Sequence, residues 1–193
     1  KHASGGPDGL GLAGRAVILR VRFALPKRWK PELGYLDLER KMAETGISSP
    51  SAQQIFDAVA ARGIAREHIT EEALQLHVQD HYGGTAAVDR LMAEAGVMPA
   101  DRVLDICSGM GGPARYIAWK TGCQVTGVDL TASRVAGATA LTEAAGLAER
   151  VQFHHGNALA LSFADASFTL AISQEAFAHI PNKSTLVAGI ARV

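Results

Sequence analysis

The feature that most restricts the fold of this chain is a short apolar run that ends in a glycine-rich turn, Val103–Gly112. The run Val103–Ile106 predicts a buried strand. The glycines that follow predict a tight turn, and Pro113 predicts that a helix begins there. A strand joined to a helix by such a turn is the part of an open α/β sheet that binds nucleotides.

From residue 101 onward, apolar runs of strand length alternate with helical patterns. We predict strands at 103–106, 123–128, 151–154 and 168–172, and helices over 113–121, 132–145 and 183–193. Strands that alternate with helices pair in parallel, and near-continuous apolar runs fit strands covered on both faces. The predicted fold class is therefore α/β, with a doubly wound, Rossmann-like, mostly parallel sheet.

Helical patterns precede this alternating part. They cover 36–44, 50–62 with Ser49 as N-cap and with Ile55, Val59 and Ala60 on one face, 70–82 with Thr70 as N-cap, and 85–95 with Gly96 at its end. We therefore divide the chain into a helical lid region, 36–97, and a nucleotide-binding domain, 98–193. Residues 1–35 stay unassigned, as a disordered tail or a segment foreign to the domain, although 16–23 has the pattern of a strand.

Composition excludes several classes of partner. Basic and acidic residues number 19 each, so no net charge favours nucleic acid or an anionic membrane. No apolar stretch approaches the roughly 20 residues that span a bilayer. The chain has 2 cysteines, too few for a disulfide framework, so we expect a cytoplasmic protein. The sequence leaves the oligomeric state open.

The glycine turn leaves two ligands open by spacing alone. Gly109–Ala114 fits the dinucleotide fingerprint, and Asp129 follows at the distance of a carboxylate that binds ribose hydroxyls. Charge separates the two ligands. A dinucleotide would place its pyrophosphate near Asp105, whereas S-adenosylmethionine presents an ammonium and a sulfonium, which suit a carboxylate.

Four ordered motifs resemble those of class I S-adenosylmethionine-dependent methyltransferases. They are Val103–Gly112, Val125–Leu130, Phe153–Ala158 and Ser167–Gln174. The resemblance extends from about Met98 to Val193 and favours the small-molecule branch, which includes sarcosine/dimethylglycine and quinone-pathway methyltransferases. The similarity to the sarcosine-type enzymes is somewhat closer.

The resemblance implies roles for individual residues of the cofactor site. It places Asp105, Gly109 and Gly111 along the methionine part of the cofactor, Asp129 at the ribose, Leu130 on the adenine ring, Asn157 and Ala158 at the adenine edge, and Gln174 near the sulfonium. Two positions depart from the family pattern. Cys107 stands where a glycine is usual, and its small side chain is tolerated there if the backbone angles are ordinary. Asn157 stands where Asp is common, but its amide still forms hydrogen bonds.

The segment after the fourth strand, 173–181, is expected to face the transferred methyl group. His179 is a candidate general base, or else only part of the pocket wall. Glu175 either binds a substrate cation or faces solvent. Tyr82, next to the Gly83-Gly84 break, is a candidate contact for the cofactor carboxylate or the substrate, or else an ordinary helix end.

Other functions remain possible at this stage. We expect no metal, because the adjacent His154 and His155 point to opposite faces of a strand. The alternatives to a small-molecule methyltransferase are a nicotinamide-dependent oxidoreductase and a cofactor-binding module without catalysis. The family continues beyond the motifs seen here, so we expect a fragment without its C-terminal strands. Such a sheet would expose an edge, and we expect poor solubility or weak activity.

Overall fold

The computed structural model describes residues 50–79 and 81–193. In chain order its elements are α2 (Ala52–Ala60), η1 (Arg66–His68), α3 (Glu71–Gln75), α4 (Gly84–Ala95), β1 (Arg102–Ile106), α5 (Gly112–Thr121), β2 (Gln124–Asp129), α6 (Ala132–Ala144), β3 (Val151–His155), β4 (Leu170–Ile172), η2 (Phe177–His179) and α7 (Lys183–Arg192). The strand expected at 16–23 and the helix expected at 36–44 lie outside the described residues.

The sheet has 4 strands in the order β3-β2-β1-β4. All three neighbouring pairs are parallel, with Asp105 opposite Gly127 on one side and Ile172 on the other. Each predicted strand is present, although β4 is shorter than the expected 168–172. The doubly wound, Rossmann-like parallel sheet is confirmed.

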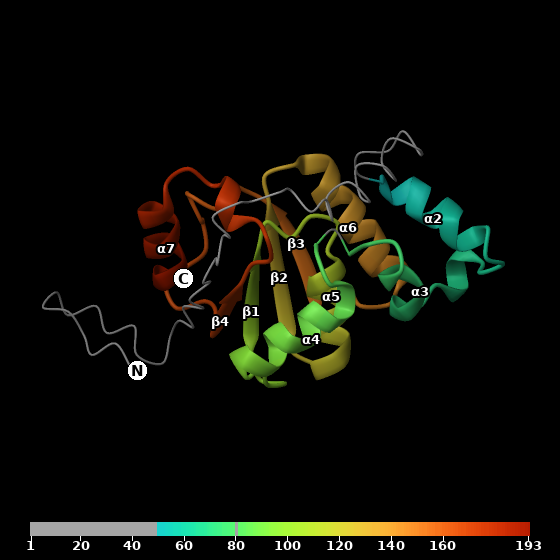
Figure 1. Ribbon diagram of the computed structural model, residues 1–193, viewed down its shortest axis with the longest axis horizontal. Helices are drawn as coiled ribbons and strands as arrows, with labels where there is room; N and C mark the ends of the chain where they lie inside the picture. The colour runs from blue at the N-terminus through green and yellow to red at the C-terminus, as the bar shows by residue number, and fades with distance from the viewer. Residues whose placement is uncertain (1–49, 80) are drawn as a thin grey trace, which may run out of the picture.

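Alternating residues of the strands feed two separate cores. Val103 packs with residues of α4 and α5 on one face, whereas Leu104 and Ile106 pack with Leu186 of α7 on the other. Because successive strand residues point to opposite faces, both faces are apolar, as a sheet covered on both sides requires. Figure 1 shows α7 beside β4 at one edge of the sheet, and α2 and α3 beyond α6 at the other end.

The N-terminal helices form a third core against α6. Ile55, Phe56 and Val59 of α2 pack with Leu74 of α3 and with Leu141 of α6. This region therefore covers one end of the sheet layer, rather than standing apart from it. No helix in the described part of the chain has the length and apolar character needed to cross a membrane.

Two details of the helix predicted at 50–62 are wrong. The N-cap is Ser51 and not Ser49, since Ser51 and Gln54 exchange the reciprocal hydrogen bonds of a capping box. Ala60 is exposed, and Phe56 takes its place on the buried face. The buried residues are then spaced i, i+1 and i+4, which fits one face of a helix.

The helix predicted at 70–82 begins as expected but ends early. Thr70 caps it, with its hydroxyl accepting a hydrogen bond from the Ala73 N–H. The helix ends at Gln75 instead of reaching Tyr82. The chain beyond it must bring Val78 onto the start of α5, where the Val78 carbonyl lies against Gly112. The helix α3 therefore stops before Val78, because Val78 packs against α5. No local sequence pattern predicts this contact.

Candidate functional site at the carboxyl ends of the strands

The functional residues gather at the point where the strand order reverses. From β1 the chain proceeds to β2 and β3 on one side and then returns to β4 on the other side of β1. Crevices of open α/β sheets open at this position, at the carboxyl ends of the strands. Asp105 lies near the end of β1, Asp129 ends β2, and Gln174 follows β4 by two residues.

The glycine turn is tied to the end of β2 through Asp129. The Gly109 N–H donates to Asp129 Oδ2 at 2.9 Å, and the Thr131 N–H donates to Oδ1 at 2.9 Å. The side chain is buried, so these two charge-assisted bonds fix the carboxylate in place. Each oxygen keeps one lone pair, which leaves the carboxylate able to accept two further hydrogen bonds.

Asp105 has the chemistry of a cation site. The residue is 3% exposed, and its Oδ2 has no hydrogen-bond partner within the described chain. Burial raises the pKa of Asp105 to about 7, and the nearby Asp129 adds to the rise. A buried acceptor without a partner is costly. An ammonium group would offset that cost, so the site fits S-adenosylmethionine and disfavours a pyrophosphate.

The backbone angles at Cys107 are not the ordinary ones under which its side chain would be tolerated without strain. Its φ is 61°, in the left-handed region that glycine adopts without penalty. For a residue with a Cβ this conformation costs roughly 1–2 kcal/mol. The turn after β1 therefore keeps the backbone path that a glycine would take, and the surrounding contacts hold the cysteine in that path.

Two of the glycines are required by protein packing. A Cβ at Gly111 would lie 2.3 Å from the Phe153 ring, and one at Gly112 would lie 2.1 Å from the Val78 carbonyl oxygen. The same Phe153 ring also lies over Gly127 of β2, where a Cβ would lie 2.4 Å from the ring. The turn is thus confined between Phe153 of β3 on one side and the N-terminal region, residues 50–82, on the other.

A buried ion pair supports the glycine turn, and no sequence pattern predicts it. Arg115 Nε lies 3.1 Å from Glu71 Oε2, with both side chains almost fully buried. Arg115 Nη1 donates to the Met110 carbonyl of the turn at 2.8 Å. Burial raises the pKa of Glu71 to about 7, although Arg115 opposes the rise. In the sequence, Glu71 has only the pattern of an acidic residue in the first turn of a helix, which does not indicate this pairing.

A chain of side-chain hydrogen bonds runs from this ion pair to the end of β4. Gln75 Nε2 donates to Glu71 Oε1 and also to the Gly112 carbonyl, at 3.2 Å for the latter. Gln79 Nε2 donates to Gln75 Oε1, and His81 Nε2 meets Gln79 Oε1. Glu71, Gln75 and Gln79 recur every four residues in the sequence. This spacing does not by itself indicate that their side chains bond to one another in series.

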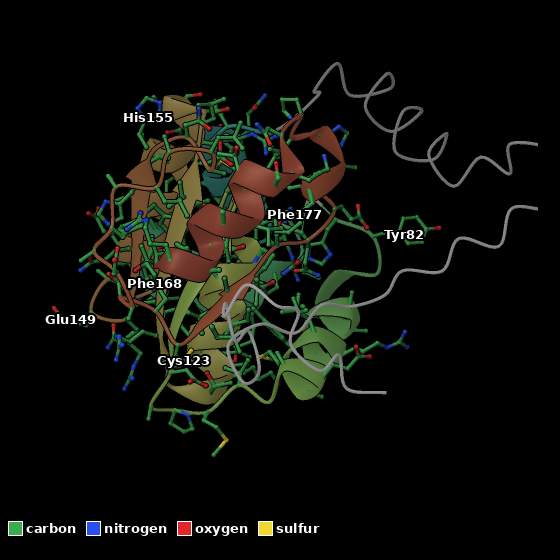
Figure 2. All side chains as sticks on the ribbon, turned by 90° about the vertical axis from the view of Figure 1, so that its left-hand side faces the viewer. Tyr82, Cys123, Glu149, His155, Phe168 and Phe177 are labelled. Carbon is green, nitrogen blue, oxygen red and sulfur yellow. The ribbon has the colours of Figure 1, made fainter. Side chains whose placement is uncertain are left out.

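The residues expected around adenine lie at the ends of β2 and β3. Leu130 is 68% exposed, which leaves an apolar side chain available beside Asp129. Asn157 uses its Oδ1 to accept the Leu159 N–H at 2.9 Å, while the Ala158 side chain is buried in the core. His155, labelled in Figure 2, places Nε2 3.0 Å from the Leu130 carbonyl oxygen.

The structure places the expected catalytic side chains at the surface. His179 is exposed in η2 and makes no side-chain hydrogen bond within the described residues. Tyr82 is 72% exposed, and Figure 2 shows its ring pointing away from the body of the protein. Its backbone N–H donates to Glu175 Oε1 at 2.9 Å, so Glu175 contacts the lid region.

Comparison with known proteins agrees with this geometry. Residues 103–193 match the family model described as "Methyltransferase domain". A 24-methylenesterol C-methyltransferase 2 of Oryza sativa subsp. japonica is 39% identical over 95 residues, which is 49% of this chain and 26% of that protein. A glycine/sarcosine/dimethylglycine N-methyltransferase of Actinopolyspora halophila is 31% identical over 106 residues, which is 55% of this chain and 19% of that protein.

Solved structures give the same family. A putative sarcosine dimethylglycine methyltransferase from Galdieria sulphuraria superposes with a TM-score of 0.53 at 28% identity, over 56% of this chain and 40% of that one. The chain spans less than half the length of each of these relatives. With its glycine turn, its buried Asp105 and its parallel strand order, the region 103–193 resembles the class I S-adenosylmethionine-dependent methyltransferases in both sequence and fold.

Proposed function

We propose that this chain transfers a methyl group from S-adenosylmethionine to a nitrogen, oxygen or carbon nucleophile of a small molecule. The observation that carries the proposal is Asp105, a buried carboxylate with an oxygen that has no partner among the described residues, beside a glycine turn. An oxidoreductase site would have to place a pyrophosphate next to that carboxylate. The family match over 103–193 supports the same conclusion.

Each residue of the cleft has a proposed task toward the cofactor. Asp105 pairs with its ammonium group, and the backbone of Gly109 and Gly111 lies along its methionine part. Asp129 accepts hydrogen bonds from the ribose hydroxyls through the lone pairs that the turn leaves free. The remaining contacts are Leu130 on the adenine face, Asn157 and Ala158 at the adenine edge, and Gln174 at the methionine end.

When bound, S-adenosylmethionine supplies the electrophilic methyl group. The task of the protein is then to align a nucleophile with it and to exclude water from both centres. We propose His179 as the base for an acceptor that must lose a proton, and Tyr82 as a contact for the acceptor or the cofactor carboxylate. Both side chains are exposed here, so each would have to turn inward.

The acceptor is proposed only as a class. The relatives named above act, by their names, on a sterol carbon and on a small amine, at 39% and 31% identity. Sequence identity therefore does not favour the sarcosine type over the others. A cytoplasmic location is supported by Cys107 and Cys123, which are both free thiols.

Calorimetry with S-adenosylhomocysteine and with NAD tests the proposal. We expect binding of the nucleoside thioether and no binding of NAD, because only the former brings a cation to Asp105. Binding of NAD alone would reject the proposal in favour of the oxidoreductase. Binding of the thioether, together with failure in a broad screen of methyl acceptors, would favour a cofactor-binding module without catalysis.

The role of His179 needs a separate measurement. His179→Ala should lower kcat by about 100-fold or more toward an acceptor that must be deprotonated, which is the usual size of a general-base contribution. His68→Ala is the matched control, since His68 is an exposed histidine in another 3-10 turn. A near-normal kcat in His179→Ala at saturating acceptor would rule out the base.

A further inference from the structure

The hydrogen-bond chain from Glu71 to Gln174 has a direction, and that direction begins at the buried ion pair. Arg115 offers only donors, and its Nε meets Glu71 Oε2. At pH 8, above the raised pKa of Glu71 of about 7, the carboxylate is ionised and accepts on both of its oxygens. Gln75 must then turn its amide nitrogen toward Glu71 Oε1, and the Gly112 carbonyl at 3.2 Å demands the same orientation. The oxygen of Gln75 is thereby left as the acceptor for the next amide.

The same logic continues through Gln79 to His81. Gln79 donates through Nε2 to Gln75 Oε1, which turns its own oxygen toward His81 Nε2. That ring nitrogen must therefore carry the proton. A neutral ring then has its lone pair on Nδ1, which lies 3.5 Å from Gln174 Nε2. The Tyr82 carbonyl oxygen also lies 3.1 Å from Nδ1, and it would accept a hydrogen bond only if this nitrogen were protonated as well. It therefore competes with Gln174 for Nδ1, and the protonation of the ring decides between them.

The last link fixes the orientation of Gln174. With its nitrogen turned to His81, its Oε1 is buried and has no hydrogen-bond partner within the described chain. Asp105 Oδ2 is in the same state, and Asp105 pairs across the sheet with Ile172, two residues before Gln174. Two neighbouring strand ends thus each present one buried acceptor, and a group with several N–H donors satisfies both.

We propose that Glu71, Gln75, Gln79 and His81 are positioning residues that orient the Gln174 amide, so that its Oε1 accepts a hydrogen bond from the ammonium group of the cofactor. This inference rests on the proposed function, because it takes S-adenosylmethionine as the ligand. It also gives the N-terminal region, which lies outside the family match over 103–193, a part in binding that acts through Gln174.

The experiment compares two ligands that differ in the ammonium-bearing part. S-adenosylhomocysteine carries it, and 5′-methylthioadenosine is an adenosine thioether without it. Gln79→Leu interrupts the chain without touching the glycine turn. At pH 8 it should lower the affinity for S-adenosylhomocysteine about tenfold, the size expected for one hydrogen bond to a charged group. The affinity for methylthioadenosine should stay within about twofold.

Gln53→Leu is the matched control. Gln53 makes the same kind of bond four residues along a helix, to Asp57 at 2.8 Å, but on the exposed face of α2. It should change neither affinity. An equal loss of both ligands in Gln79→Leu, or no loss of either, would overturn the positioning role. If neither ligand bound to the unaltered chain, the proposed function itself would fail, and the inference with it.

The ring of His81 provides a second test that does not depend on ligand binding. Long-range proton–nitrogen NMR at pH 8 should show His81 protonated on Nε2 alone, with its signals assigned by their loss in His81→Gln. In Gln79→Leu the ring should populate both tautomers, because Nε2 no longer faces a fixed acceptor. A ring protonated on Nδ1 in the unaltered chain, alone or together with Nε2, would overturn the proposed direction.

Discussion

Two parts of the described chain, residues 50–82 and residues 102–193, contribute to the candidate site in different ways. Residues 102–193 carry motifs whose positions along the sequence correspond directly to positions in the cleft, such as Asp105 and Asp129 at the ends of β1 and β2. The N-terminal region, 50–82, carries no such motif. It acts through Glu71, Gln75 and Val78, which contact the glycine turn or the helix that follows it.

This difference shows that a cofactor turn is only partly a local structure. Its glycines and its strand come from consecutive residues, but its support comes from Glu71, which lies 44 residues before Arg115 in the chain. Arg115 joins the two regions, since it binds both Glu71 and the Met110 carbonyl. If this interpretation is correct, damage to the N-terminal region should disturb the turn, and damage to the turn should loosen the N-terminal region.

The largest expected effect comes from breaking the buried ion pair. Arg115→Met leaves Glu71 without its cation in a dry site, which should lower the free energy of unfolding by about 3–5 kcal/mol. Urea unfolding at pH 8 measures it. Asp165→Asn is the control, because it removes the exposed pair with Arg192 at 2.7 Å and should cost less than about 1 kcal/mol. Similar losses in both variants would mean that the two regions are not coupled through Arg115.

An intermediate effect is expected where the N-terminal backbone meets the turn. Gly112→Ala would bring a Cβ within 2.1 Å of the Val78 carbonyl oxygen, and we expect a loss of about 1–3 kcal/mol from this overpacking. Gly189→Ala, in α7, meets nothing closer than 4.0 Å and should be neutral or stabilising by up to about 1 kcal/mol. Thermal unfolding compares them. A stability of Gly112→Ala equal to that of the unaltered chain would show that the contact with Val78 yields freely.

The smallest expected effect involves residues 102–193 alone. Burial raises the pKa of Asp105 to about 7, and an ammonium ligand binds its ionised form. Below that pH, binding must displace a proton, so the affinity for S-adenosylhomocysteine should rise about tenfold from pH 6 to pH 8. Calorimetry across this range measures the rise.

Asp105→Asn provides the control for this pH dependence. It should bind more weakly at pH 8 and lose most of the rise, because the amide does not titrate. A rise of the same size in Asp105→Asn would assign the titration to another group. The comparison between residues 50–82 and residues 102–193 would then have to include that group.

The sequence predicted most elements of the sheet domain because their signals are local. Apolar runs gave the four strands, and glycines gave helix ends such as Gly96. The same local signals gave Asp105 and Asp129, whose places follow from the strands that carry them. The N-terminal helices were less predictable. Their caps and ends shifted, as at Ser51 and Gln75, because packing against α6 and the turn decided where each helix stops.

The sequence by itself determined the class of fold, predicted the class of ligand and placed Asp105 and Asp129 at the strand ends, since these depend on strand periodicity, turn chemistry and charge. Only the tertiary structure decided what supports those groups. It paired Glu71 with Arg115, forced Cys107 into a left-handed conformation and aligned Gln75 and Gln79 toward Gln174. The physical reason is that buried polar groups must find partners, and those partners are set by the meeting of distant segments rather than by spacing along the chain.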